Sequence, residues 1–160
     1  MFSATKILVP IDFSDTSRAA LSAGLQMASL NGGTLWLLHV ESGMEEDVDQ
    51  GSEEAADALS QIDTHEAAMK TAYELEVQRC SDAGRTLAPV EVKYRVSGGD
   101  WREVANQMVD ELQLDLIVTA THGPQGLKGR VMGSDSERLL SMVTCSVMVV
   151  KPKGYPYLRD

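Results

Sequence analysis

The fold of this chain is decided by residues 114–140, whose sequence is LDLIVTATHGPQGLKGRVMGSDSERLL. The stretch begins with an apolar run, Leu114–Val118, that predicts a buried strand, and it ends with residues 135–140, which predict the first turns of a helix. The loop between them is rich in glycine. Glycine lets the backbone approach a ligand closely, and a helix N-terminus offers unpaired N–H groups and the positive end of the helix dipole. This order of elements therefore predicts a site for an anion.

Outward from this stretch, apolar runs and helical patterns alternate along the chain. Such alternation predicts parallel strands joined by right-handed crossovers. We therefore expect a single domain over residues 1–160, an α/β fold with a five-stranded parallel doubly wound sandwich of Rossmann-like type. The predicted strands are residues 6–11, 34–40, 90–96, 114–118 and 146–150, and the helical patterns cover residues 19–28, 59–80 and 100–112 and resume at residue 135.

Ligands of doubly wound sheets bind at the carboxyl ends of the strands, where the strand order reverses. The loops concerned begin at Asp12, Val40 and Ala120. The glycine-rich loop starts at Ala120, so the loop chemistry and the topological rule indicate the same edge of the sheet.

The two expected edge strands differ in charge. Residues 90–96 alternate apolar side chains with charged ones, whereas residues 146–150 are apolar and reach Lys151 before any charge. An apolar edge strand exposes unpaired backbone groups and needs cover. Pairing with its own copy about a two-fold axis would cover both edges, so we expect a homodimer through residues 146–150.

Composition excludes several classes of partner. Lys and Arg number 14 against 24 Asp and Glu, for a formal charge of −10, which argues against nucleic acid or an anionic membrane as a partner. The given sequence contains no secretory-signal pattern and no run long enough for a membrane span, and its cysteines are isolated, so we expect a cytoplasmic protein without membrane insertion. Acidic residues without Lys or Arg predict an exposed variable loop at about residues 41–58, and residues 153–160 form a short tail.

The sequence offers little for catalysis or metal binding. His39 follows an apolar run and is expected to be a hydrogen-bonded core imidazole, whereas His65 lies in an acidic helix and is expected at the surface. No histidine pair has metal-ligand spacing, and no Ser–His–Asp set or carboxylate pair is recognisable. We predict no metal site and no catalytic residues.

The glycine-rich loop has a spacing of its own. It matches neither the P-loop nor the dinucleotide fingerprint. Gly123 is followed by nine residues and then by Gly133-Ser134. This spacing resembles the universal stress protein family, whose nucleotide-binding members carry Gly-x2-Gly-x9-Gly-[Ser/Thr] after the fourth strand. Ala120 stands where the first glycine of that pattern belongs, and the resemblance extends over almost the whole chain, from residues 6–14 to residues 147–152.

The resemblance implies an adenine nucleotide alpha hydrolase-like fold, a homodimer through the last strand, and ATP, or AMP or cAMP, as ligand, with or without Mg²⁺. Asp12 and the Val40 backbone would hold adenine and ribose, and Thr119 and Ala120 would line the base and the sugar. The phosphates would lie on Gly123, Gly133, Ser134 and Ser136. The full predicted nucleotide-binding set is Pro10, Ile11, Asp12, Val40, Thr119, Ala120, His122, Gly123, Gly133, Ser134, Asp135 and Ser136.

Two residues of the segment, Ala120 and Asp135, are unfavourable for phosphate binding, so functions without a nucleotide stay open. Ala120 adds a methyl group, and Asp135 places a carboxylate at the helix start that is expected to face phosphate, where it repels an anion unless Mg²⁺ bridges the two. The main interpretation is an ATP-binding stress-response or signalling protein. The alternatives are an interaction protein of the same fold that binds no nucleotide, and a weak nucleotide hydrolase.

Overall fold

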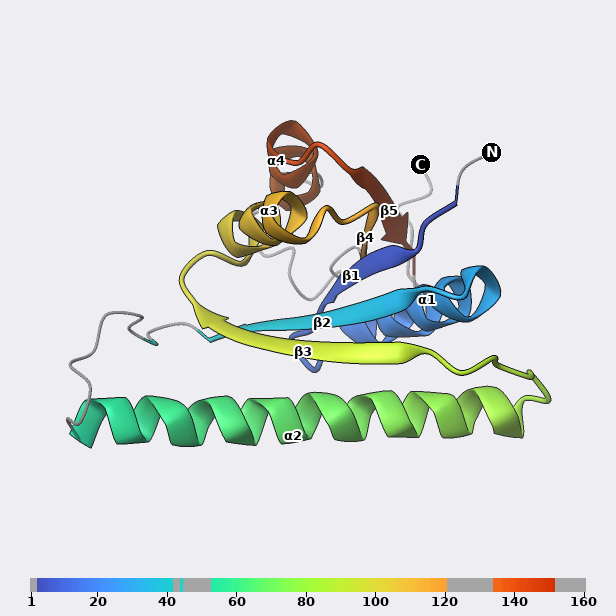
Figure 1. Cartoon of the computed structure of the whole chain (residues 1–160), viewed down its shortest axis with the longest axis horizontal. Coiled ribbons are helices and arrows are strands. Elements are labelled where there is room, and N and C mark those ends of the chain that lie inside the picture. Colours follow the sequence, from blue (N-terminus) through green and yellow to red (C-terminus); the bar gives the residue numbers. More distant parts are fainter. Residues whose placement is uncertain (1–2, 42–43, 45–52, 121–133, 152–160) are drawn as a thin grey trace, which may run out of the picture.

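The structure is a computed structural model that describes residues 3–41, 44, 53–120 and 134–151, with the backbone alone for residues 54 and 134–136. Strands and helices alternate along the chain (Figure 1). The strands are β1 (Lys6–Pro10), β2 (Thr34–Glu41), β3 (Glu91–Gly98), β4 (Leu116–Ala120) and β5 (Ser146–Val150). The helices are α1 (Asp15–Asn31), α2 (Glu53–Asp82), α3 (Trp101–Leu112) and α4 (Ser134–Met142).

The strands form one parallel sheet in the order β3-β2-β1-β4-β5. The chain builds outward from β1 through β2 to β3, then crosses to the other side of β1 for β4 and β5. The strand order therefore reverses between β1 and β4. The α/β class, the parallel doubly wound sheet and the placement of β3 and β5 at opposite edges are confirmed.

Alternating side chains of the central strands divide the core into two layers. Ile7 and Val9 of β1 pack in one cluster with residues of α1 and with Met69 of α2. Leu8, between them, packs on the other face with residues of α3 and α4. Figure 1 shows α2 below the sheet and α3 and α4 above it. Both faces of the central strands are covered, which explains their nearly continuous apolar sequences.

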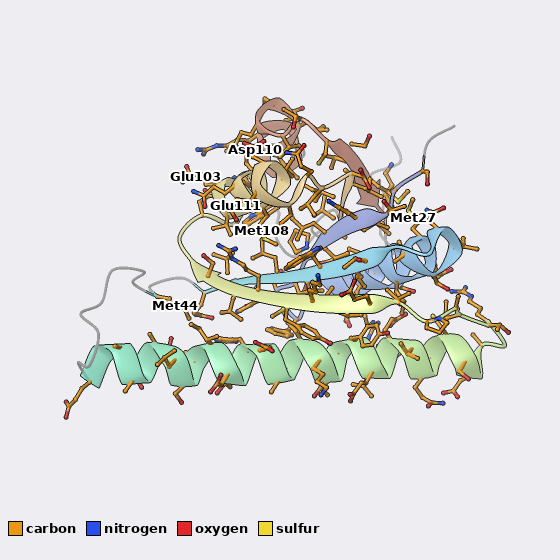
Figure 2. All side chains as sticks on the ribbon, viewed as in Figure 1. Met27, Met44, Glu103, Met108, Asp110 and Glu111 are labelled. Carbon is orange, nitrogen blue, oxygen red and sulfur yellow. The ribbon has the colours of Figure 1, made fainter. Side chains whose placement is uncertain are left out.

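Polar side chains cap the N-termini of α1 and α3. The side chain of Ser14 caps α1 by accepting from the Ser17 N–H, and Gly32 ends that helix in the left-handed conformation. The Asp100 side chain caps α3 by accepting from the Arg102 N–H. Helix α3 is amphipathic, because Met108 is buried in the core whereas the acidic residues Glu103, Asp110 and Glu111 are exposed (Figure 2).

The last part of the predicted acidic loop belongs to helix α2. Helix α2 begins at Glu53, six residues before the periodic pattern that starts at Leu59, so residues 53–58 are helical rather than part of a loop. Their sequence, EEAADA, explains the difference, because alanine has high helix propensity and acids are favourable near a helix N-terminus. Burial along α2 begins later still, because Leu59 is exposed and Met69 is fully buried. None of the helices in the described part of the chain is long and apolar enough to cross a bilayer.

Candidate functional site

A cleft of about 260 Å³ opens at the carboxyl ends of the central strands. It lies where the strand order reverses, the position at which doubly wound sheets bind ligands. Its walls come from the ends of β1, β2 and β4 and from the first turns of α1 and α3. The lining residues are Pro10, Ile11, Asp12, Thr16, Ser17, Leu38, Val40, Trp101, Thr119 and Ala120.

The β1 side of the cleft is organised by Asp12. Its Oδ1 atom accepts hydrogen bonds from the Ser14 N–H, at 3.0 Å, and from the Ser14 hydroxyl, at 2.5 Å. Ser14 is the residue that caps α1, so Asp12 supports the helix cap rather than forming it. This contact holds an exposed carboxylate at the mouth of the cleft, beside the positive end of α1.

The opposite wall is Trp101, the first residue of α3. The residues on either side of it form an ion pair, in which the Arg102 Nε donates to Asp100 Oδ1 at 2.9 Å and Arg102 Nη2 contacts Oδ2 at 2.5 Å. Hydrogen bonds from the Arg102 side chain and backbone hold the pKa of Asp100 well below its usual range. The ion pair therefore flanks the residue whose indole lines the cleft.

The predicted site residues fall into two groups. The first group consists of the predicted residues at the ends of the strands, and all of them line this cleft: Pro10, Ile11, Asp12, Val40, Thr119 and Ala120. His122, Gly123 and Gly133 lie outside the described residues. Ser134, Asp135 and Ser136 form the first turn of α4, and their side chains are not described. Contact of any of these residues with a nucleotide stays a prediction.

The sequence analysis missed part of the cleft lining. Thr16, Ser17, Leu38 and Trp101 were not predicted to belong to it. Leu38 could have been found from the sequence, because it lies two residues before Val40 and side chains two apart share a face of a strand. Trp101 gave no such signal, because only the packing of α3 brings it to the ends of strands far away in the sequence.

A second polar cluster lies at the end of β2. His39 is buried, as predicted, and its Nδ1 atom lies 2.8 Å from the Ile11 carbonyl oxygen. The prediction for His65 was wrong: its ring is only 4.4 Å from the His39 ring, centroid to centroid, and its side chain is 24% exposed. Linear spacing could not reveal this contact, since it depends on how α2 packs on β2.

A family model described as the universal stress protein family matches residues 4–151. The chain belongs to this family. Universal stress protein A homolog 1 of Coxiella burnetii is 30% identical over 148 residues, which cover 90% of this chain and 94% of that protein.

Solved structures of other proteins share the fold. The hypothetical protein MJ0577 is 28% identical to this chain, with a TM-score of 0.66, and the match covers 95% of this chain and 99% of that one. A universal stress protein in complex with cAMP is 19% identical, with a TM-score of 0.61 and coverage of 93% and 98%. At that identity the likeness concerns the fold alone.

Proposed function

We propose that this protein binds an adenine nucleotide in the cleft at the ends of β1, β2 and β4, and acts as a homodimeric stress-response or signalling protein. The observation that carries the proposal is that Asp12, Val40, Thr119 and Ala120 all line the same cleft. These are the residues that the family resemblance implies for adenine and ribose. The relative with bound cAMP supports an adenine nucleotide as the ligand class.

The lining suits a nucleoside. Leu38, Val40 and Trp101 supply apolar surface against which a planar base can pack. The Asp12 carboxylate accepts hydrogen bonds, and the Thr119 hydroxyl both donates and accepts, which matches the hydroxyl groups of ribose. Apolar walls with a few polar groups are typical of small-molecule sites.

We propose that the phosphates lie outside this cleft. Its volume of about 260 Å³ is just below the usual range of small-molecule pockets, about 300–1,000 Å³, so it has room for a nucleoside and little more. None of the described lining residues is basic. The negative charge is therefore left to the segment that follows Ala120, through backbone N–H groups, the hydroxyls of Ser134 and Ser136, and Mg²⁺.

Thermal unfolding with and without nucleotide tests the proposal. A ligand present at about a hundred times its Kd adds roughly 2.7 kcal/mol to the unfolding free energy, which raises the Tm of a domain of this size by several degrees. We expect a rise with ATP and Mg²⁺ that exceeds the rise with GTP. No response to millimolar ATP, AMP or cAMP would favour the interaction protein that binds no nucleotide. Mass spectrometry of nucleotide released from the denatured protein identifies the ligand, and phosphate release distinguishes binding from slow hydrolysis.

A substitution in the glycine-rich segment tests the proposed phosphate site. In Gly133→Val, a branched side chain enters the glycine-rich segment, and we expect the ATP-dependent rise in Tm to disappear. Circular dichroism checks that the variant folds. Undiminished ATP binding by the folded variant would mean that the phosphates lie elsewhere.

The dimer is proposed to form through β5. This strand is at the sheet edge, and Met148 is 37% exposed on it. Antiparallel pairing with a second copy would cover both strands. We expect sedimentation to show a dimer that Met148→Lys dissociates. Leu30→Lys is the matched control, because Leu30 is an exposed leucine, 84% accessible, at the end of α1. A wild-type monomer, or a dimer indifferent to Met148→Lys, would contradict this interface.

A further inference from the structure

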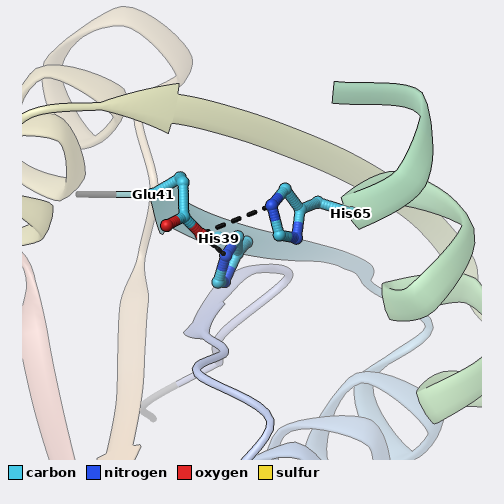
Figure 3. Close-up of side chains that lie close together, drawn as sticks. All are labelled: His39, Glu41 and His65. Atoms are coloured by element: carbon cyan, nitrogen blue, oxygen red, sulfur yellow. Dashed lines mark hydrogen bonds and ion pairs between the residues drawn. The ribbon is translucent and has the colours of Figure 1, made fainter. Parts of the chain in front are cut away.

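The end of β2 presents two different surfaces. Val40 lines the nucleotide cleft, whereas His39 and Glu41 point to the other face of the sheet, because side chains alternate along a strand. On that other face α2 supplies His65. Figure 3 shows the imidazole rings of His39 and His65 converging on the carboxylate of Glu41.

The three side chains converge on one oxygen atom. Glu41 Oε2 lies 3.3 Å from His39 Nε2 and 3.3 Å from His65 Nε2. One donor atom from each of the three residues lies within 4.8 Å of the others. Two imidazole nitrogens and a carboxylate oxygen form a donor set for transition metals.

A backbone contact orients the His39 ring. The Ile11 carbonyl oxygen can only accept a hydrogen bond, so His39 Nδ1, 2.8 Å away, carries the proton. In the neutral ring, Nε2 then presents a lone pair to the Glu41 oxygen, which is also rich in electrons. A proton on Nε2 or a cation between the two atoms would make this contact favourable. Metal-binding histidines commonly donate their second N–H to a backbone carbonyl in this way.

The two contacts with Glu41 have the spacing of ligands that share a cation. Charge-assisted N–H···O hydrogen bonds are about 2.7–2.9 Å long, shorter than both contacts here. Ligands of a tetrahedral Zn²⁺, each about 2.0–2.1 Å from the metal, lie about 3.4 Å from one another. The two separations between Glu41 Oε2 and the histidine nitrogens, 3.3 Å each, match the second value, and the donor atoms of the two histidines lie within 4.8 Å of each other. We propose that His39, Glu41 and His65 bind a divalent transition-metal ion of the Zn²⁺ type, which ties α2 to the end of β2.

The surroundings suit such a site. The Phe13 ring lies 4.9 Å from the His39 ring and 6.4 Å from the His65 ring, centroid to centroid, so it shields the cluster from water. The backbone of Phe13 has a φ of +61°, a conformation that residues other than glycine rarely adopt. Glu41 is 38% exposed, which leaves a path for the ion and room for water as a further ligand. Mg²⁺ and Ca²⁺ prefer oxygen ligands and should not compete.

Isothermal titration of the metal-free chain with Zn²⁺ tests this site without any nucleotide, so its outcome does not depend on the proposed cleft. We expect one Zn²⁺ per chain, no comparable binding of Mg²⁺, and a rise in Tm with Zn²⁺. His65→Gln and Glu41→Gln should each weaken Zn²⁺ binding by roughly tenfold or more, since loss of even an outer-shell partner costs about 10–100-fold. Asp63→Asn is the control, because it removes an exposed carboxylate of α2 close to His65.

A direct readout covers the possibility that a variant is damaged. In the unaltered protein, the nitrogen resonances of His39 and His65 should both shift on addition of Zn²⁺. Absence of saturable Zn²⁺ binding would overturn the proposal. Binding that is undiminished in both folded variants, or that moves neither histidine, would overturn it as well.

Discussion

The two ends of the parallel sheet use their polar groups in opposite ways. At the amino end, the Asp115 Oδ2 atom accepts from the Thr5 N–H at 2.9 Å, from the Thr5 hydroxyl at 3.1 Å and from the Lys6 N–H at 2.9 Å. The Lys6 ammonium donates to the Leu112 carbonyl at 2.9 Å. At the carboxyl end, hydroxyl and carboxylate groups border a cleft of about 260 Å³. One end therefore holds the strands together, whereas the other keeps space for a ligand.

The largest effect is expected at the amino end. Asp115→Ala removes the acceptor of three hydrogen bonds that join β1 to β4, and we expect the free energy of unfolding to fall by about 2–4 kcal/mol. Urea unfolding measures the loss. The ATP-dependent change in Tm should persist, because the cleft is at the other end. A loss below about 1 kcal/mol would show that water replaces the carboxylate without cost.

A smaller effect is expected from filling the cleft. Ala120→Leu adds bulk to the cleft wall, and we expect it to remove the ligand-dependent stabilisation, roughly 2.7 kcal/mol at a hundredfold excess over Kd, while the fold survives. Ala83→Leu is the matched control at an exposed position just past the end of α2. Thermal unfolding with and without ATP compares the two. Equal responses would place the nucleotide outside the cleft.

The smallest effect concerns acid stability. The pKa of Asp100 is lowered in the folded chain, so the ionised form contributes stability above the ordinary pKa of 3.8, and that contribution is lost as the pH falls toward the lower folded value. Asp100→Asn keeps a capping side chain but removes the charge that pairs with Arg102, so it should cost about 1 kcal/mol near neutral pH and less at pH values below 3.8. Urea midpoints of both proteins across this range measure the difference. A constant difference would show that the ion pair with Arg102 does not contribute.

Much of the sheet was predictable because its signals are local. The apolar run 34–40 predicts β2, which spans Thr34–Glu41, and the helical pattern predicted for residues 19–28 lies inside α1, which spans Asp15–Asn31. Element limits were less accurate. The predicted strand 114–118 became Leu116–Ala120, and α2 began before its apolar period. Hydrogen bonding and helix propensity set these limits, and neither follows the hydrophobic pattern closely.

The sequence by itself determined the alternation of strands and helices, the family, and the edge of the sheet that carries the cleft, because each depends on short-range patterns combined with the rules of parallel connection. Only the tertiary structure decided that Trp101 forms a wall of the cleft and that His65 meets His39 and Glu41. These contacts join residues far apart in the chain. They depend on how the helices pack on the sheet, a property that no single segment encodes.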